Sequence, residues 1–437
     1  MTIILLILTV FFGTLGIVFF NYIAINPSTV VSAGFFVGTL ALLFSTQDWQ
    51  VQLSFKTIQL ISLGLGFFLV GSLLPYIAFK VSRKNEKLIG DQALYEKKII
   101  RARVNSTSIA IIAVCFQIFV TVYLYIYLRS ATQGTGLSEI ISTFRNSTMS
   151  SGDDGLQITG FLKQLQVFSM AYSFVFAFLY FYKRIVENYK CSFLYIIPLL
   201  FYIFQSLLTG GRLQIFRVIL FIGSSIYFLQ LYKKDSPSYA NYFILKVGKW
   251  IIGIIPVFYF LKNFLGRTSE DSFFQYIFRY LGGPMEGLDL FIKSNYSYSH
   301  MYGQETFAGV YSLLTKLGIE NQPIKLSWIM APTGIWVGNV YTAFRRYYSD
   351  FGLSGVAILM FMLGIFFGVL FSNIVRGHMR KEIAGFSIIL YSFYFYSLVF
   401  TFFDDTFYTT AISLGSLVQI IEMYAIYRLF TYRQMKV

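Results

Sequence analysis

Long uninterrupted apolar runs constrain this chain more than any other feature of its sequence. A bilayer core about 30 Å thick is crossed by about 20 apolar residues in an α-helix. Eleven stretches of the chain meet this requirement. They predict membrane-spanning helices over residues 3–24, 29–45, 57–79, 107–128, 160–182, 191–208, 213–232, 243–265, 351–374, 383–403 and 410–430.

The composition favours the same fold class. Of the 437 residues, 56% are hydrophobic and only 13% are charged, whereas a soluble domain contains roughly 25% charged residues. The large share of aromatic residues, 20%, is typical of spans with aromatic anchors at the headgroup level. We therefore expect an all-α, polytopic transmembrane helix bundle that forms one integral membrane domain over residues 1–437.

The basic residues indicate the orientation of the spans. Five regions at alternate connections hold 21 of the 35 Lys and Arg residues, and such an excess in short loops marks the cytoplasmic side. They are the loop 80–106 and the segments near 183–190, 233–249, 376–381 and 428–436. We expect the C-terminus inside and the N-terminus outside. The net charge of +15 then reflects topology and attraction to anionic lipids, and no nucleic-acid partner is expected.

Few residues could bind a metal ion or form a disulfide. Cys115 and Cys191 are expected at different depths in the membrane, which argues against a bridge between them. His300 and His378 are the only histidines, and no Cys/His cluster accompanies them. We expect no metal site and no cofactor.

The longest connection on the outer side spans residues 266–350. It is about 85 residues long and contains seven acidic residues, which is too long for a simple connector. Phe307, Val310, Leu314 and Leu317 recur at helical spacing, as in a helix that lies on the membrane surface. We expect an extracytoplasmic loop that contains interfacial helices.

A Gly-Gly-Arg turn is the sharpest local motif. Gly210 and Gly211 form a tight outer hairpin between two spans, with Arg212 at the start of the next helix and Arg217 about 7.5 Å deeper. A helix N-terminus and an arginine fork both attract phosphate oxygens. The structural alternative is that Arg212 reaches lipid headgroups and Arg217 contacts a neighbouring helix.

A second polar segment precedes the span that begins near residue 351. Arg346 and Asp350 are four residues apart on one helical face, and Arg345 is adjacent. They form either a local ion pair with Arg345 in the headgroups, or an anion site in which Asp350 acts as a base or orients Arg346. Glu305 and His300 are further titratable candidates in the outer segment.

Other acidic residues are assigned structural or solvent-facing positions. Glu286 and Asp289 are further titratable candidates, but each of these four candidates, Glu305 and His300 included, is more often a solvated loop residue than a catalyst. Asp404 and Asp405 are expected to end a span.

The segments Leu208-Thr-Gly-Gly-Arg212, Asn339-Val-Tyr341-Thr and Asp350-Phe-Gly352, with the long outer loop, resemble the bacterial oligosaccharide repeat-unit polymerases. These are the Wzy-type O-antigen and capsule polymerases of polysaccharide and lipopolysaccharide biosynthesis. The resemblance covers the architecture of the whole chain, with recognisable residues at 205–220 and 280–366.

This resemblance implies a metal-independent glycosyltransferase of the GT-C type in the bacterial cytoplasmic (inner) membrane. The enzyme would join undecaprenyl-diphosphate-linked oligosaccharide units at the outer face, with a chain-length regulator and a flippase as possible partners. Positive charge would stabilise the leaving diphosphate, and a base would take the acceptor proton. The expected diphosphate ligands are Arg212, Arg217, Arg345 and Arg346, aided by Gly210 and Gly211; Asp350 or Glu305 is the base, and Tyr341, Tyr302 and His300 line the sugar site.

Three other functions compete with this hypothesis. An O-antigen ligase shares the chemistry and has a large late outer loop with arginines and a histidine, for which His300 is a candidate. A lipid-linked oligosaccharide flippase belongs to a different class and needs two pseudo-symmetric halves. No internal repeat is evident here. A purely structural membrane subunit would not need arginines at a span end.

Overall fold

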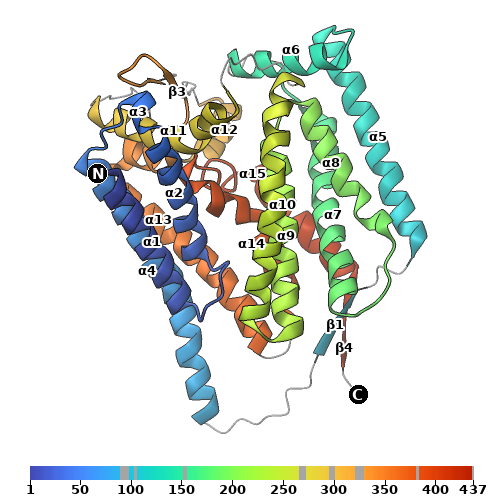
Figure 1. Ribbon diagram of the computed structural model, residues 1–437. Helices are drawn as coiled ribbons and strands as arrows, with labels where there is room; N and C mark the ends of the chain where they lie inside the picture. The colour runs from blue at the N-terminus through green and yellow to red at the C-terminus, as the bar shows by residue number, and fades with distance from the viewer. Residues whose placement is uncertain are drawn as a thin grey trace. The chain divides into compact units, whose positions relative to one another are not determined.

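The computed structural model describes residues 1–88, 98–102, 106–150, 155–264, 272–294, 301–319, 329–379 and 383–435. Helices dominate these residues, and the strands form two small antiparallel pairs (Figure 1). Eight of the described helices are long and apolar enough to cross a membrane. The predicted all-α, multi-pass architecture is therefore confirmed at this level.

Those eight helices coincide with eight of the eleven expected spans. The other three expected spans fall on α8, α10 and α15, and α8 has only 12 residues. A helix is also present at the residues expected to form a surface helix, as α12.

The chain divides into two compact units that are interleaved along the sequence. Unit 1 comprises Met1–Ala93, Asp271–Arg376 and Tyr396–Ser416, and unit 2 comprises Leu94–Glu270, Gly377–Phe395 and Leu417–Val437. Unit 1 contains α1 (Thr2–Phe19), α2 (Pro27–Phe44), α3 (Thr46–Trp49), α4 (Phe55–Leu88), α11 (Phe273–Lys293), α12 (Ala308–Lys316), β2 (Ile329–Met330), β3 (Trp336–Gly338), nearly all of α13 (Thr342–Met379) and η3 (Phe400–Phe402). Unit 2 contains β1 (Lys98–Ala102), α5 (Thr107–Thr132), α6 (Leu137–Ser150), α7 (Gly160–Ile185), η2 (Phe193–Tyr195), α8 (Ile197–Leu208), α9 (Leu213–Lys234), α10 (Pro237–Phe264), most of α14 (Gly385–Val399), most of α15 (Leu414–Leu429) and β4 (Thr431–Met435).

Glycines allow α4 and α13 to approach each other closely in unit 1. A Cβ on Gly71 would lie 2.2 Å from the carbonyl oxygen of Phe361, and one on Gly364 would lie 2.5 Å from that of Phe68. Gly364 and Gly368 form a Gly-xxx-Gly pair, and Gly368 approaches the backbone of Ser72 in the same way. Small residues at this spacing let membrane helices approach until their backbones touch.

Helix α11 lies in the segment 266–350, and the sequence pattern did not predict it. It begins with a capping box formed by Ser272 and Gln275, and Gly282 brings its backbone against α2. Glu286 and Asp289 lie on this helix and are 1% and 0% exposed. The expectation that they are solvated loop residues is therefore wrong, because the helix packs against α2, α4 and β3.

Asp289 attaches α11 to the start of α4. Its Oδ1 atom accepts hydrogen bonds from the Ser54 amide at 2.8 Å, the Ser54 hydroxyl at 2.8 Å and the Thr57 hydroxyl at 2.6 Å. Its Oδ2 atom lies 2.6 Å from Nζ of Lys293. Figure 1 shows α3, α11, α12 and β3 gathered at the same end of α1, α2 and α4.

A buried amide network ties together the spans of unit 2. The side chain of Gln205 on α8 donates to Gln117 on α5 at 2.8 Å and to Thr121 at 2.9 Å. Gln117 in turn donates to Ser173 on α7 at 2.7 Å. Hydrogen bonds between apolar helices fix their register because no water competes for these groups.

Contacts within unit 2 connect all five basic regions. Strand β1, in the 80–106 loop, pairs with β4 near the C-terminus, and the amide of Ala102 donates to Glu187 at 3.2 Å. Lys233 donates to Asn188 at 2.5 Å. Asp235 and His378 approach within 2.9 Å, which brings in the segment near 376–381. Figure 1 shows β1 and β4 at the end of this unit opposite α6.

Candidate functional site

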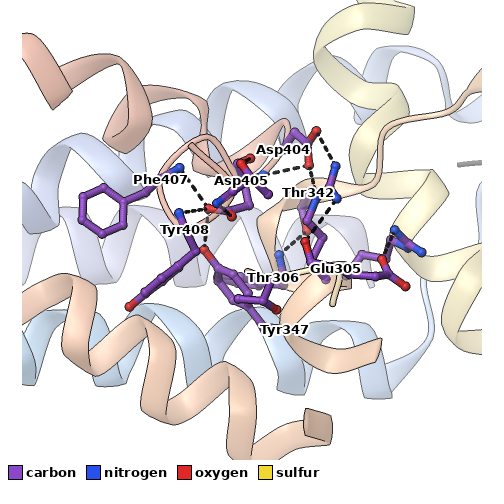
Figure 2. Close-up of polar contacts among 12 residues, drawn as sticks. Glu305, Thr306, Thr342, Tyr347, Asp404, Asp405, Phe407 and Tyr408 are labelled. Carbon is purple, nitrogen blue, oxygen red and sulfur yellow. Dashed lines mark hydrogen bonds and ion pairs between the residues drawn. The ribbon is translucent and has the colours of Figure 1, made fainter. Parts of the chain in front are cut away.

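Three segments of unit 1 form a buried polar cluster, which we call the Arg345 cluster. They are the turn 301–307 before α12, the first three turns of α13, and the turn that follows η3. The cluster consists of Glu305, Thr306, Arg345, Arg346, Ser349, Asp350, Asp404 and Asp405. Figure 2 shows Glu305 and Thr306 approaching the turn that holds Asp404 and Asp405.

The start of α13 is held in an unusual backbone conformation. Thr342 has φ +62°, a region that a β-branched residue rarely occupies. Its amide donates to the carbonyl of Phe403 at 3.0 Å, and its hydroxyl accepts from the amide of Phe344 at 3.2 Å. These bonds stabilise the left-handed residue and join α13 to the turn after η3.

Gly352 separates this first part of α13 from the membrane span. Its backbone, with φ +66° and ψ −157°, is not helical and lies in a region that is essentially restricted to glycine. The sequence predicted a span from residue 351, and the break falls at that position. Residues 342–351 therefore form a short helix of their own, which presents Arg345, Arg346, Ser349 and Asp350.

Arg345 and Glu305 form an ion pair in the interior of unit 1. The arginine side chain is 1% exposed and the glutamate 0%. The guanidinium also lies over the rings of Phe291 and Tyr341, at 5.1 and 5.5 Å from their centroids. Burying an isolated charge here would cost a large free energy. The carboxylate of Glu305 and the two aromatic faces together offset this cost for the guanidinium of Arg345.

Arg346 is paired with Asp404 by two parallel contacts. Nε lies 3.0 Å from Oδ1 and Nη2 lies 3.2 Å from Oδ2, while Nη1 donates to the Glu305 carbonyl at 3.4 Å. The pair is more accessible than Arg345, with side-chain exposures of 15% and 25%. Its fork-to-fork geometry is the one with which arginine binds carboxylate or phosphate.

Asp350 fastens the turn 301–307 to α13. Its carboxylate accepts from the amide of Thr306 at 2.7 Å and from that of Glu305 at 3.4 Å. Ser349 donates to Oε1 of Glu305 at 2.8 Å. Four residues of one helix thus hold the dipeptide Glu305-Thr306 through its backbone and its acidic side chain.

Asp405 organises the turn after η3. It accepts hydrogen bonds from the amides of Phe407, Tyr408 and Thr409 at 2.8–3.1 Å and from the hydroxyl of Tyr347 at 3.0 Å (Figure 2). Burial raises the pKa of Asp405 to about 6, against the lowering effect of Arg346.

The proposed sugar-binding residues differ in their surroundings. Tyr302 is 77% exposed, and its ring meets Phe351 edge to face at 4.7 Å. Tyr341 is buried between Phe291 and Arg345, where it supports the guanidinium. His300 lies outside the described residues.

Gly210, Gly211, Arg212 and Arg217 belong to unit 2. The two glycine amides close the end of α8 by donating to Leu207 and Ser206 at 2.9 Å, and Gly210 has φ +76°. The side chain of Arg145 on α6 covers Gly210, because a Cβ there would lie 3.0 Å from it. The predicted hairpin is therefore present, with a third arginine against it.

Arg212 and Arg217 are both buried. Arg212 is the N-cap residue of α9 and is 5% exposed, so it does not extend away from the protein. Arg217 lies over the ring of Phe393 at 4.0 Å and that of Phe174 at 5.9 Å. Such cation–π contacts with neighbouring helices are what the structural alternative for Arg217 predicts.

Sequence reasoning did not name four members of the Arg345 cluster as site residues: Thr306, Ser349, Asp404 and Asp405. Asp404 does follow the end of a span, as expected, but it also pairs with Arg346 from 58 positions away. Ser349 gave no signal, since serine is common at the ends of spans. Among the described residues, no three His, Cys, Asp or Glu side chains are placed to hold a metal ion.

No protein family, curated protein or solved structure that was compared with the chain matches it.

Proposed function

We propose that this chain is a membrane glycosyltransferase that joins oligosaccharide units carried on undecaprenyl diphosphate at the outer face of a bacterial cytoplasmic membrane. The observation that supports this most directly is the Arg345 cluster. Two adjacent arginines and a glutamate lie together where the long segment 266–350 enters α13, a helix apolar and long enough to cross a membrane. This is where a lipid-linked diphosphate presents its charge.

The reaction needs positive charge at one point and a base at another. The bond between the sugar anomeric carbon and the diphosphate oxygen breaks, and its electron pair stays on the diphosphate. The acceptor hydroxyl oxygen forms the new bond, and its proton passes to a carboxylate. Arg345 and Arg346 can stabilise the developing negative charge, and the carboxylate takes the proton as a general base.

The geometry favours Glu305 over Asp350 as this base. Asp350 already accepts two backbone hydrogen bonds, which commit its oxygens to holding the turn 301–307. Among the described residues, the carboxylate of Glu305 contacts only the side chains of Arg345 and Ser349. We therefore assign Asp350 to positioning and Glu305 to proton transfer.

A second arginine site would suit the second substrate. Donor and acceptor both carry a diphosphate, and a site for each must offset that charge. Arg212, at the N-terminus of α9 and next to the Arg145-covered turn, is the candidate in unit 2. Arg217, with its two aromatic contacts, is assigned to supporting this region.

The glycolipid pattern of a deletion strain tests the proposal. A polymerase loss collapses the ladder to a single repeat unit, whereas a ligase loss leaves long chains unattached to their acceptor. Loss of a flippase leaves no repeat units at the outer face. Either of the last two patterns would contradict the polymerase assignment.

Variants in the same strain test the cluster. Arg345→Lys keeps the charge but loses the planar fork, so we expect shortened or absent polymer with a normal protein level in the membrane. Arg184→Lys, which replaces an arginine that contacts Tyr180 on α7, is the matched control and should leave the ladder unchanged. Arg212→Ala should also abolish polymer if it holds a diphosphate. A normal ladder with Arg345→Lys would argue against phosphate binding by this residue.

A further inference from the structure

The Arg345 cluster contains more acidic than basic side chains. Arg345 pairs with the carboxylate of Glu305, and the charges of Asp404, Asp405 and Glu305 act on Arg346. Asp350 belongs to the same cluster through its bonds to the amides of Glu305 and Thr306. Free guanidinium groups would attract an anion, but here both are already paired with carboxylates in a poorly hydrated site. A phosphate group can therefore bind only by taking the place of one of these carboxylates, because an added negative charge without exchange is strongly disfavoured.

Three of the four carboxylates are tied to the backbone. Asp350 accepts from two amides and Asp405 from three. Asp404 accepts from the amide of Asp405 at 2.8 Å in addition to its two bonds with Arg346. Displacing any of them would break the turn or helix end that it stabilises.

Glu305 differs from the other three. Among the described residues, its carboxylate contacts only two side chains, Arg345 and Ser349. Its backbone is fixed separately, since its amide donates to Asp350 and its carbonyl accepts from Arg346. The side chain can therefore rotate away from Arg345 while the turn 301–307 keeps its place.

We propose that Glu305 is the exchangeable counter-ion of Arg345. In the empty protein its carboxylate occupies the position that a phosphate oxygen of the lipid diphosphate takes on binding. The displaced carboxylate, released from its arginine, then receives the proton of the acceptor hydroxyl. Binding of the donor diphosphate thereby frees the Glu305 carboxylate, so that proton transfer from the acceptor can follow only after the donor has bound. This inference rests on the proposed function and adds the way in which Arg345 is neutralised, and the site kept inactive, without substrate.

Binding of inorganic pyrophosphate to the purified full chain in lipid nanodiscs tests the exchange. Glu305→Gln replaces the competing carboxylate with a neutral amide, so calorimetry should show pyrophosphate binding about tenfold tighter, the size expected when one charged competitor at an arginine is removed. The same variant should make no polymer. Ser349→Ala removes the second contact of Glu305 and should tighten binding about threefold, the effect of losing one modest hydrogen bond.

Two matched controls keep this test specific. Glu286→Gln removes a buried carboxylate elsewhere in unit 1, and Ser354→Ala removes an exposed hydroxyl that bonds only within α13. Both should bind pyrophosphate like the native chain. Glu305→Gln leaves Arg345 without its carboxylate partner and can fail to fold. In that case the exchange is tested by whether Ser349→Ala binds pyrophosphate more tightly than Ser354→Ala does.

The possible failures are distinguishable. Unchanged or weaker pyrophosphate binding by folded Glu305→Gln and by Ser349→Ala, together with loss of binding in Arg345→Ala, would overturn the exchange and leave the proposed function standing. An absence of pyrophosphate binding in the native chain and all variants would overturn the assignment of Arg345 to phosphate, and the exchange with it.

Discussion

Arg346 and Asp404 meet through two parallel contacts, Nε to Oδ1 at 3.0 Å and Nη2 to Oδ2 at 3.2 Å, although 58 positions separate them in the chain. This pair connects the first part of α13 to the turn after η3. It places Arg346 beside the carbonyl of Glu305, so the same guanidinium joins all three segments of the Arg345 cluster.

We expect the Arg346–Asp404 pair to contribute measurably to stability. A double-mutant cycle with Arg346→Gln and Asp404→Asn should give a coupling energy of about 1.5–3 kcal/mol, because both hydrogen bonds involve charged groups. The measurement is unfolding of the purified chain in detergent. As a control, Asp48→Asn changes an exposed side chain on α3 and should leave the free energy of unfolding unchanged. Additive effects of the two substitutions would contradict a direct interaction.

The break in α13 should depend on glycine at position 352. A Cβ there has open space around it, so Gly352→Ala tests backbone conformation alone. We expect a loss of about 1–3 kcal/mol, because φ +66° with ψ −157° is not available to alanine without strain. Gly248→Ala, inside α10 with equally open space, should instead stabilise the chain by about 0.5–1 kcal/mol. The melting temperatures of the two variants should shift in opposite directions.

The α4–α13 contact should not tolerate a larger residue at position 364. In Gly364→Ala the new Cβ would lie 2.5 Å from the Phe68 carbonyl oxygen, so the helices must separate at a cost of about 1–3 kcal/mol. Gly66→Ala, on α4 with ordinary contacts of 3.7 Å to Phe12, is the control. Equal membrane levels and equal melting temperatures for the two variants would show that this close contact is not needed.

Glu286 should make unit 1 less stable as the pH rises. Burial and the nearby Asp289 raise the pKa of Glu286 from 4.5 to about 7, so the folded protein holds a proton that the unfolded chain has lost. Stability is then greatest below about pH 4.5, decreases between pH 4.5 and 7, and levels off above pH 7.

The size of that decrease follows from the shift. About 1.4 kcal/mol per pH unit over this window gives roughly 3 kcal/mol from this one group. Glu286→Gln should remove this part of the pH dependence and raise the melting temperature at pH 8 more than at pH 5. Parallel pH profiles for the native chain and the variant would refute the assignment.

The orientation of the chain can be tested by thiol labelling. In a background with Cys115→Ser and Cys191→Ser, Leu317→Cys at the end of α12 should react with an impermeant reagent on intact cells, because this residue is 71% exposed on the expected outer side. Tyr432→Cys, on β4 and 40% exposed, should react only after lysis. The reverse pattern would invert the topology and exclude a reaction at the outer face.

The sequence pattern was most informative where a single segment determines the structure. Eight spans, the α12 helix and the Gly210-Gly211 turn each depend on residues close together in the chain. The start of the span at residue 351 was also predictable, since apolar residues begin there. The missed helix, α11, has an amphipathic rather than uniformly apolar sequence and contains Pro284 and several glycines, which resembles a loop when read locally.

Burial and pairing in the Arg345 cluster could not be read from the chain. Nothing near Glu305 in the sequence indicates that Arg345 will be its partner, or that Asp404 will neutralise Arg346. The local alternative for Arg346 was Asp350, four residues away, yet Asp350 bonds the backbone of Glu305 and Thr306.

Hydrophobicity and helical period are local properties, so the order of residues alone shows that this protein is built of apolar helices and at which positions its arginines and acids lie. Which arginine pairs with which carboxylate, and which of these groups are buried, depends instead on how the helices pack. Ion pairing in a low-dielectric interior depends on distances of a few ångströms between segments, and those distances are set by how the helices pack.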